Sequence, residues 1–487
     1  MEIRVRFAPS PTGFLHVGGL RTCLYNWLFA RKNGGKIILR LEDTDRSRYV
    51  ENAEENLMQS LQWAGIDFDE SPKQGGPYGP YIQSQRLEIY KEYTAKLIEN
   101  ETAYYAFDTP EEIEIMRAEL QAQKKDPKYI REKMRNSLTL SKEEVDELLN
   151  SDFPKVVRLK VDPEEIIVFK DIIRGEIKVK GADIDDQVLM KSDGFPTYHL
   201  ANVVDDHLMK ISHVIRGEEW LPSTPKHILL YNAFSWQVPA FAHLPLLLNK
   251  DKSKLSKRQG SVAVEDFREK GYLRDAFVNF VALLGWNPSA NEEIYDIQQL
   301  VESFNLEKVN KGGAVFDTQK LDWMNAQYLK KTPVQELAVQ LASILEKMQI
   351  RARPQEYLEK TVSLFIERIT FVSDILENHP YMFSIPAEYE LEYMNKHWKD
   401  DTPETITGLI AKLKSVHDFT HDSTHNAAKQ YADENSLKFK EIVHPLRLMI
   451  TGKSTGAGMF ETMEVLGRDE CFKRIEAFLD KKEKGYL

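Results

Sequence analysis

Cysteine is almost missing from this chain of 487 residues, which contains only Cys23 and Cys471. Two thiols cannot build a disulfide framework or a four-thiolate zinc site, and so few thiols suit a reducing compartment. Apolar runs are also short, well below the roughly 20 residues that a membrane-spanning helix needs. The first residues lack the basic and apolar regions of a signal peptide. We therefore expect a cytoplasmic protein without a membrane partner.

The composition excludes further classes of protein. The 24 glycines and 21 prolines are too few for a collagen-like chain, and 42% apolar residues are too many for a disordered one. The formal net charge of −11 argues against a protein that coats nucleic acid through its bulk charge, but a local basic groove stays possible. The length suggests about three globular domains.

The first 45 residues predict a βαβ unit. Residues 3–7 alternate like a strand, residues 8–13 contain prolines and a glycine, a helical period starts near Gly19, and residues 36–41 form a second apolar strand. This order indicates an α/β fold with a parallel sheet. After about Trp323 the pattern becomes amphipathic and helical, with helices expected at residues 333–349, 354–379, 403–416 and 471–482. We place a domain boundary near Asn325.

A loop at residues 8–19 is the first candidate site. Gly18 and Gly19 remove side chains at a helix N-terminus, where the helix dipole favours phosphate, and His16 can offer a hydrogen bond or a positive charge. Taken alone, this motif is better explained by a glycine-capped turn with a surface histidine.

A basic loop at residues 252–260 is the second candidate site. Lys254 and Lys257 stand in a segment with four cations, serines and a glycine, as expected of a mobile phosphate clamp. A solvated basic loop is the simpler explanation when this segment is taken alone.

The two motifs in this order resemble the HIGH and KMSKS signatures of class I aminoacyl-tRNA synthetases. Further segments are similar to bacterial glutamyl-tRNA synthetases, and the resemblance extends over essentially the whole chain. These segments are residues 40–45, 75–81, 83–86, 195–207, 214–220, 444–447 and 451–452. Leu255 and Arg258 are the glutamyl-type variants of the second signature.

The resemblance implies a Rossmann-type catalytic region at residues 1–325. It would contain an acceptor-stem-binding insertion at about residues 80–195 and a stem-contact region at about residues 245–325. An all-helical anticodon-binding domain would occupy residues 326–487. This division agrees with the change of pattern near Asn325.

The resemblance implies that ATP with Mg²⁺ activates L-glutamate to glutamyl-adenylate, which then acylates the 3′ end of tRNA(Glu). His16, Lys254 and Lys257 would be the catalytic residues, because charge builds on phosphoryl oxygens. The ATP site would consist of His16, Gly18, Gly19, Glu219, Leu247, Lys254, Ser256 and Lys257. The family generally forms the adenylate only with tRNA bound, and we carry this property over as an implication.

The implied glutamate site must bind one ammonium group and two carboxylates. Glu42, with Ser10 and the backbone of Ala8, would hold the ammonium group. The side-chain carboxylate would be held by two arginines and two hydrogen-bonding residues, Arg6, Arg216, Tyr198 and Asn202. Because a buried guanidinium loses its charge partner when it faces an amide, Arg216 should select glutamate over glutamine.

Arg368 and Arg447 align with the anticodon readers of the family. An arginine at position 368 is typical of members that charge only tRNA(Glu). An enzyme that also charges tRNA(Gln) has the same active site and remains the alternative. A short relative that glutamylates a tRNA base and a non-catalytic tRNA-binding module fit less well, because the chain keeps the anticodon-binding half, His16 and both lysines. We expect a monomer.

Three further expectations concern metals and packing. Many relatives carry a zinc site that begins Cys-x-Cys, but Ala106 and Asp108 stand at those positions here, so we predict no structural zinc. We also expect both cysteines to be buried and inert. Trp220 and Trp286 are expected to lie in the core.

Overall fold

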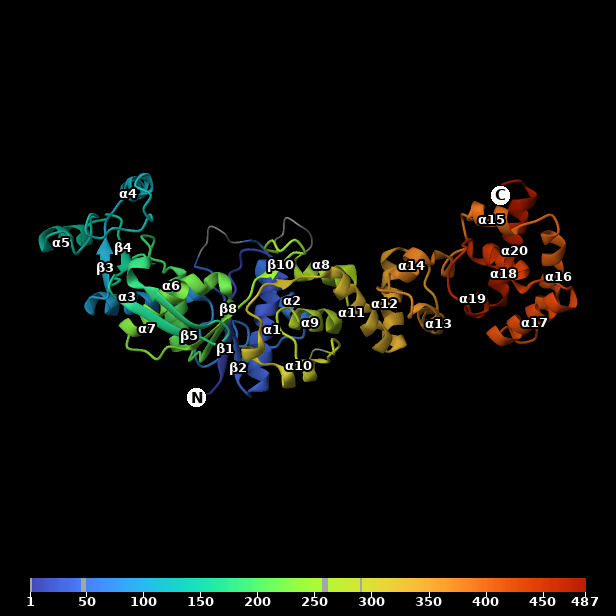
Figure 1. Cartoon of the computed structure of the whole chain (residues 1–487), viewed down its shortest axis with the longest axis horizontal. Coiled ribbons are helices and arrows are strands. Elements are labelled where there is room, and N and C mark those ends of the chain that lie inside the picture. The colour runs from blue at the N-terminus through green and yellow to red at the C-terminus, as the bar shows by residue number, and fades with distance from the viewer. Residues whose placement is uncertain (1, 45–49, 256–261, 290) are drawn as a thin grey trace. The chain divides into compact units, whose positions relative to one another are not determined.

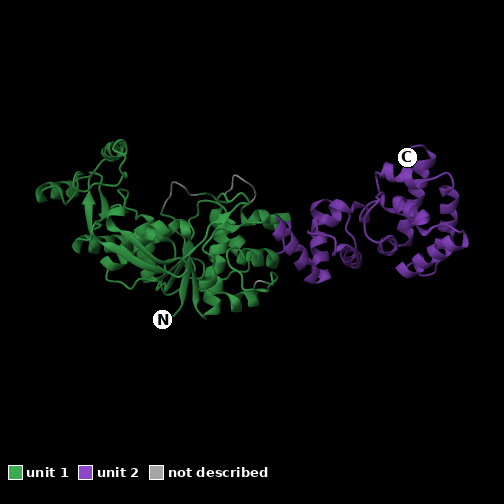
Figure 2. Cartoon of the chain, viewed as in Figure 1, with its two compact units in different colours: residues 1–270, 274–318 green, residues 271–273, 319–487 purple. Residues whose placement is uncertain are grey.

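The computed structural model describes residues 2–44, 50–255, 262–289 and 291–487. The chain forms two compact units, residues 1–270 with 274–318 and residues 271–273 with 319–487 (Figure 2). The first unit combines helices and strands, and the second is helical over the residues described. Within the same residues, no helix is both long and apolar enough to cross a membrane. Ser256 and Lys257 lie outside the described residues.

The elements are labelled as in Figure 1. The strands are β1 (Arg4–Phe7), β2 (Lys36–Leu39), β3 (Ala103–Ala106), β4 (Val156–Leu159), β5 (Ile166–Asp171), β6 (Gly175–Lys180), β7 (Val188–Met190), β8 (His213–Gly217), β9 (Ala240–Leu244), β10 (Leu247–Leu248) and β11 (Ala314–Val315). The helices of the first unit are α1 (Val17–Lys32), α2 (Ala53–Trp63), α3 (Leu87–Glu99), α4 (Pro110–Ala122), α5 (Lys142–Asn150), α6 (Tyr198–Leu208), α7 (Thr224–Ala233), α8 (Val264–Lys270), α9 (Arg274–Ala282) and α10 (Ile297–Ser303). The remaining helices are α11 (Thr318–Lys331), α12 (Val334–Lys347), α13 (Gln355–Phe365), α14 (Asp374–Asn378), α15 (Leu391–His397), α16 (Thr402–Lys414), α17 (His421–Glu434), α18 (Phe439–Thr451), α19 (Met459–Leu466) and α20 (Arg468–Glu483).

A mostly parallel arrangement of strands forms the centre of the first unit. Strands β5, β9 and β8 are parallel neighbours, while β6 adds an antiparallel edge through a tight turn at Gly175. Strand β1 pairs in parallel with β2 and lies beside β8, because the Ser212 N–H donates to the Arg4 carbonyl at 2.9 Å. The expected α/β fold with a parallel sheet and a following helical domain is confirmed.

Helix α1 follows the predicted βαβ order and begins at Val17, slightly before the expected Gly19. Leu20, Leu24 and Leu28 recur every four residues and are buried, so one face of α1 packs against β1, β2 and β8. Parallel strands end at one common edge of a sheet. The loop after β1, the segment after β2 and the end of β8 therefore meet at this edge.

The segment between β2 and β8 also contributes a separate antiparallel sheet, in the order β3, β4, β7. Helix α4 starts with a capping box in which Thr109 and Glu112 bond to each other's backbone N–H. Ala106 ends β3, and the Asp108 carboxylate accepts from the Tyr129 hydroxyl at 2.6 Å and from the Arg135 N–H at 2.7 Å. The absence of zinc stays a prediction.

The second unit is built around one apolar core to which most of its helices contribute. The helix expected at residues 354–379 is in fact two helices, α13 and α14. The chain breaks between them because the Asp374 carboxylate accepts from the N–H groups of Thr370 and Phe371. Asn325 is buried in α11, where its side chain accepts from the Leu273 N–H and donates to the Thr370 carbonyl. Both cysteines and Trp286 are buried, as expected.

Candidate active site

A cavity of about 670 Å³ opens at the carboxyl edge of β1, β2 and β8. Every residue expected to bind glutamate lines this cavity, and so do most of the described residues expected to bind ATP. The lining includes Arg6, Ala8, Ser10, His16, Gly18, Gly19, Glu42, Tyr198, Asn202, Arg216 and Glu219. The structure thus brings together positions that are more than 200 residues apart in the sequence.

His16 is both the N-cap of α1 and part of the cavity wall. Its Nδ1 atom accepts from the Gly18 N–H at 2.9 Å, so the ring carries its proton on Nε2 when it is neutral. The first turn of α1 contains no acidic side chain, and its dipole therefore favours an anion in front of it. The N–H groups of Val17 and Gly18 are used within the protein, where they donate to the Val262 carbonyl and to His16 Nδ1.

The described flanks of the second motif lie against the first motif. On one side, the Leu255 N–H donates to the Leu247 carbonyl at 2.9 Å, and Lys254 pairs with Leu248. On the other side, the Val17 N–H donates to the Val262 carbonyl at 2.9 Å. Leu247 also packs beside Gly18. Leu247 and Lys254 are not among the residues that line the cavity, but their segment borders the His16 loop.

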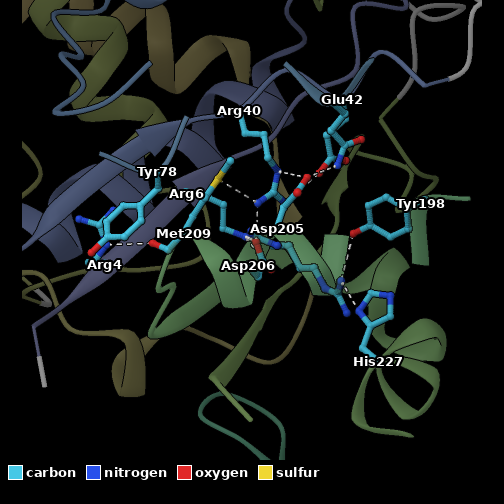
Figure 3. Close-up of polar contacts among 12 residues, drawn as sticks. Arg4, Arg6, Arg40, Glu42, Tyr78, Tyr198, Asp205, Asp206, Met209 and His227 are labelled. Carbon is cyan, nitrogen blue, oxygen red and sulfur yellow. Dashed lines mark hydrogen bonds and ion pairs between the residues drawn. The ribbon is translucent and has the colours of Figure 1, made fainter. Parts of the chain in front are cut away.

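A buried network of alternating charges supports one wall of the cavity (Figure 3). Arg6 Nε lies 3.1 Å from Asp206, and Arg40 bridges Asp206 at 2.7 Å and Glu42 at 3.0 Å. Burial raises the pKa of Glu42, although Arg40 and Arg6 oppose this effect. Burial also works against ionisation of Asp206, but the two arginines outweigh it and lower its pKa. The network holds Arg6 and Glu42 in place without surface side chains.

Arg216, on β8, also lines the cavity and is only 4% exposed. Its donors reach uncharged acceptors: the Tyr198 hydroxyl at 3.1 Å, His227 Nδ1 at 3.3 Å, His243 Nε2 at 3.1 Å and the Thr224 hydroxyl at 3.0 Å. Over the described residues, no carboxylate forms an ion pair with it. A buried cation without a counter-charge, at the wall of a cavity, is suited to bind an anion.

Asn202 is a second buried group at the cavity wall that is suited to bind a ligand. Its side chain is 2% exposed and lines the cavity. In the part of the chain that is described, the Nδ2 group of Asn202 has no hydrogen-bond partner. Because an unsatisfied buried donor is costly, this amide indicates that an acceptor from a bound molecule belongs here.

Two features of the site differ from the sequence-based expectations. Trp220 is not a core residue: it is 38% exposed, lines the cavity and lies against Tyr198 with 4.3 Å between the ring centroids. The expectation was wrong because Trp220 lies in a short 3₁₀ segment at the cavity rim. Glu218 was not singled out, yet its carboxylate accepts from the Leu246 N–H at 2.8 Å and so places the backbone before Leu247.

Sequence reasoning also missed Asp206, Arg40 and the two histidines behind Arg216. Their only signal was the unusual density of charged and imidazole groups in otherwise apolar segments. Arg368 and Arg447, in the second unit, donate to adjacent carbonyls, of Gly456 at 3.1 Å and of Ala457 at 2.9 Å. The structure thus places both expected anticodon readers against one loop, at Gly456 and Ala457.

Comparison with known protein families agrees with this geometry. The family described as tRNA synthetases class I (E and Q), catalytic domain, matches residues 2–323, and an anticodon binding domain matches residues 334–479. The chain belongs to this family of class I tRNA synthetases.

Among curated proteins, the glutamate–tRNA ligase of Chloroherpeton thalassium is 50% identical over 98% of both chains. That of Chlorobaculum parvum is 48% identical over 97% of both chains. A crystal structure of a glutamate–tRNA ligase from Elizabethkingia meningosepticum, in complex with its amino acid, superposes with a TM-score of 0.94. That match has 42% identity and covers 98% of this chain and 99% of the other.

Proposed function

We propose that this chain is a glutamate–tRNA ligase, which activates L-glutamate with ATP and transfers it to the 3′ end of tRNA(Glu). The observation that carries the proposal is the buried Arg216, which has no carboxylate partner in the described structure and faces a cavity that also contains Arg6 and the unpaired amide of Asn202. Such a wall suits a side chain that ends in a carboxylate.

Glu42, also in the cavity lining, suits the ammonium group of the amino acid. The Glu42 N–H donates to the Pro9 carbonyl at 3.0 Å, which brings the Glu42 backbone beside the loop that contains Ala8 and Ser10. An ammonium group would supply the positive charge that favours ionised Glu42. The substrate then extends from Glu42 towards Arg6, Tyr198, Asn202 and Arg216.

In the first step the α-carboxylate oxygen of glutamate attacks the α-phosphorus of ATP, and the bond to the bridging oxygen of pyrophosphate breaks. His16 would donate from Nε2 to a phosphoryl oxygen, and Lys254 and Lys257 would follow the charge that moves to pyrophosphate. Mg²⁺ would arrive with ATP, since it keeps phosphate and water ligands. Gly18, Gly19, Glu219, Leu247 and Ser256 would complete the ATP site.

In the second step a hydroxyl of the terminal adenosine of tRNA attacks the acyl carbon, and AMP leaves. We propose that the insertion at about residues 80–195 binds the acceptor stem and that residues 245–325 contact the stem. Residues 326–487 would read the anticodon, with Arg368 and Arg447 as base readers. We also propose that the enzyme is a monomer and that it works in the cytoplasm, where tRNA, glutamate and ATP are available.

Amino-acid competition in an aminoacylation assay tests the proposal. Glutamate should be charged in preference to glutamine by about a hundredfold or more, because an amide leaves Arg216 without a charge partner. The Arg216→Ala change should raise the KM for glutamate far more than the KM for ATP. Equal use of glutamine by the unmodified enzyme would refute the proposed substrate, and equal effects on both KM values would refute the role of Arg216.

A further inference from the structure

Arg216 has an inner side and an outer side. Tyr198 and Trp220, which contact its Nη1 and Nη2 groups, line the cavity. His243, His227 and Thr224 contact it from behind and are at most 1% exposed. A ligand carboxylate can take over the outer contacts, whereas the inner contacts stay in place and set the direction of the guanidinium plane.

The contact with His243 depends on the position of one proton. Arg216 is always a donor, so His243 can accept through Nε2 only when its proton is on Nδ1. Asp171 meets this Nδ1 atom at 2.7 Å, and both side chains are completely buried. If the proton were on Nε2, the N–H groups of His243 and Arg216 would face each other in a buried site.

Sheet register explains why these three residues meet. Arg216 on β8 is directly opposite His243 on β9, and Asp171 ends β5, the parallel neighbour of β9 on its other side. The Asp171 carboxylate also accepts from the N–H groups of Ile173 and Arg174 at 2.9 and 2.8 Å. The carboxylate is therefore fixed by the backbone and, in turn, fixes the histidine.

The protonation states agree with this arrangement. Burial lowers the pKa of His243, an effect that Asp171 opposes only in part, so the ring is neutral at pH 7. Burial works against the charge on Asp171, but hydrogen bonds from His243 and the backbone outweigh it and lower its pKa. His227 is also held neutral, mainly by burial and then by the positive charge of Arg216.

We infer that Asp171 is a positioning residue for glutamate selection: it fixes the Nδ1–H tautomer of His243, which then holds Arg216 Nε from behind. The inference rests on the proposed function, since Arg216 is taken to bind the side-chain carboxylate of glutamate. Asp171 itself does not line the cavity. It acts on the substrate only through His243 and Arg216.

The test is a double-mutant cycle on the full-length enzyme. In Asp171→Asn the new amide can donate to Nδ1 and favours the wrong tautomer, so the KM for glutamate should rise about tenfold. The KM for ATP should change less than about twofold, and the preference for glutamate over glutamine should fall. In a His243→Gln background, Asp171→Asn should have little further effect. The side-chain oxygen of glutamine can accept from Arg216, and glutamine has no tautomer for residue 171 to select.

Controls separate this role from a purely structural one. Asp186→Asn changes another buried aspartate, within the insertion, and should leave the KM for glutamate unchanged. If Asp171→Asn does not fold, His243→Gln should still keep a lower KM for glutamate than His243→Leu. Equal effects of Asp171→Asn on both KM values, or in both backgrounds, would overturn the inference. An unmodified enzyme that does not prefer glutamate would instead refute the proposed function.

Discussion

The two arginines of the cavity are held in different ways, one by an ion pair and the other by uncharged neighbours. Arg6 is balanced by Asp206, but Arg216 is surrounded by hydroxyl and imidazole groups. Removing one partner of a buried ion pair costs about 3–5 kcal/mol. A site that is one carboxylate short therefore favours a substrate that brings this carboxylate. The histidines contribute because they can accept from Arg216 and remain neutral.

Because His199 and His227 are held neutral, we expect the protein to lose stability in acid. Burial lowers the pKa of His199 to about 4, and the pKa of His227 is also lowered. Between about pH 4 and 6.5 the unfolded chain binds more protons than the folded chain. The free energy of unfolding should therefore fall with falling pH, by up to about 1.4 kcal/mol per pH unit for each such histidine.

The midpoint of thermal unfolding at pH 7 and pH 5 measures this effect. The drop between the two pH values should be smaller in His199→Asn than in the unmodified protein, because one of the protonating groups is gone. His417→Asn is the matched control, since the His417 side chain is 98% exposed. An unchanged drop in His199→Asn would contradict the assignment.

At the scale of elements, the start of α1 combines a structural and a chemical task in one side chain. His16 caps the helix through Nδ1 and also lines the cavity, where we propose that Nε2 donates to a phosphate. An asparagine can replace the cap but not the imidazole donor. The two tasks can therefore be separated by choosing the substitution.

His16→Ala should lose both the helix cap and the imidazole donor, whereas His16→Asn should lose only the imidazole donor. We expect the free energy of unfolding to fall by about 1 kcal/mol in His16→Ala and to change little in His16→Asn. The rate of glutamate-dependent pyrophosphate exchange should fall about a hundredfold in both. Denaturant unfolding measures the free energy of unfolding. The exchange assay, with tRNA(Glu) present, measures the exchange rate. An exchange rate in His16→Asn equal to that of the unmodified enzyme would reduce His16 to a helix cap.

At the scale of the whole molecule, the residues proposed for the chemistry and those proposed to read the anticodon belong to different units. The residues of the cavity lie in the first unit, and Arg368 and Arg447 lie in the second. Both arginines donate to the loop at Gly456 and Ala457, so they present their remaining donors from one place. Changes in the second unit should therefore alter the use of tRNA and leave glutamate binding unchanged.

Charging purified tRNA(Glu) and tRNA(Gln) side by side tests this division. The unmodified enzyme should charge tRNA(Glu) only, while Arg368→Gln should charge tRNA(Gln) as well, because the guanidinium that rejects the wrong anticodon base is gone. The KM for glutamate should not change. Arg351→Gln, at another exposed arginine of the second unit, is the control. Efficient charging of tRNA(Gln) by the unmodified enzyme would favour the non-discriminating alternative.

The sequence by itself determined the class of enzyme, the α/β and helical halves, and the residues around His16, Glu42 and Arg216. These features depend on local patterns, namely the βαβ order, helical periodicity and motifs in a fixed order, which are readable along the chain. The resemblance to the family also sufficed to find that Ala106 and Asp108 stand where many relatives carry the thiols of a zinc site. The break between α13 and α14 was missed because one aspartate side chain, rather than a proline or glycine, ends the helical pattern.

Only the tertiary structure showed the groups that stand behind the cavity. Asp171, His243 and Arg216 come from three strands that parallel pairing places side by side, and Asp206 reaches Arg6 from a helix some 200 residues away. It also placed Trp220 at the cavity rim instead of in the core. Side-chain chemistry predicts what a residue can bind, but the partner, the burial and hence the protonation state depend on neighbours that are distant in sequence.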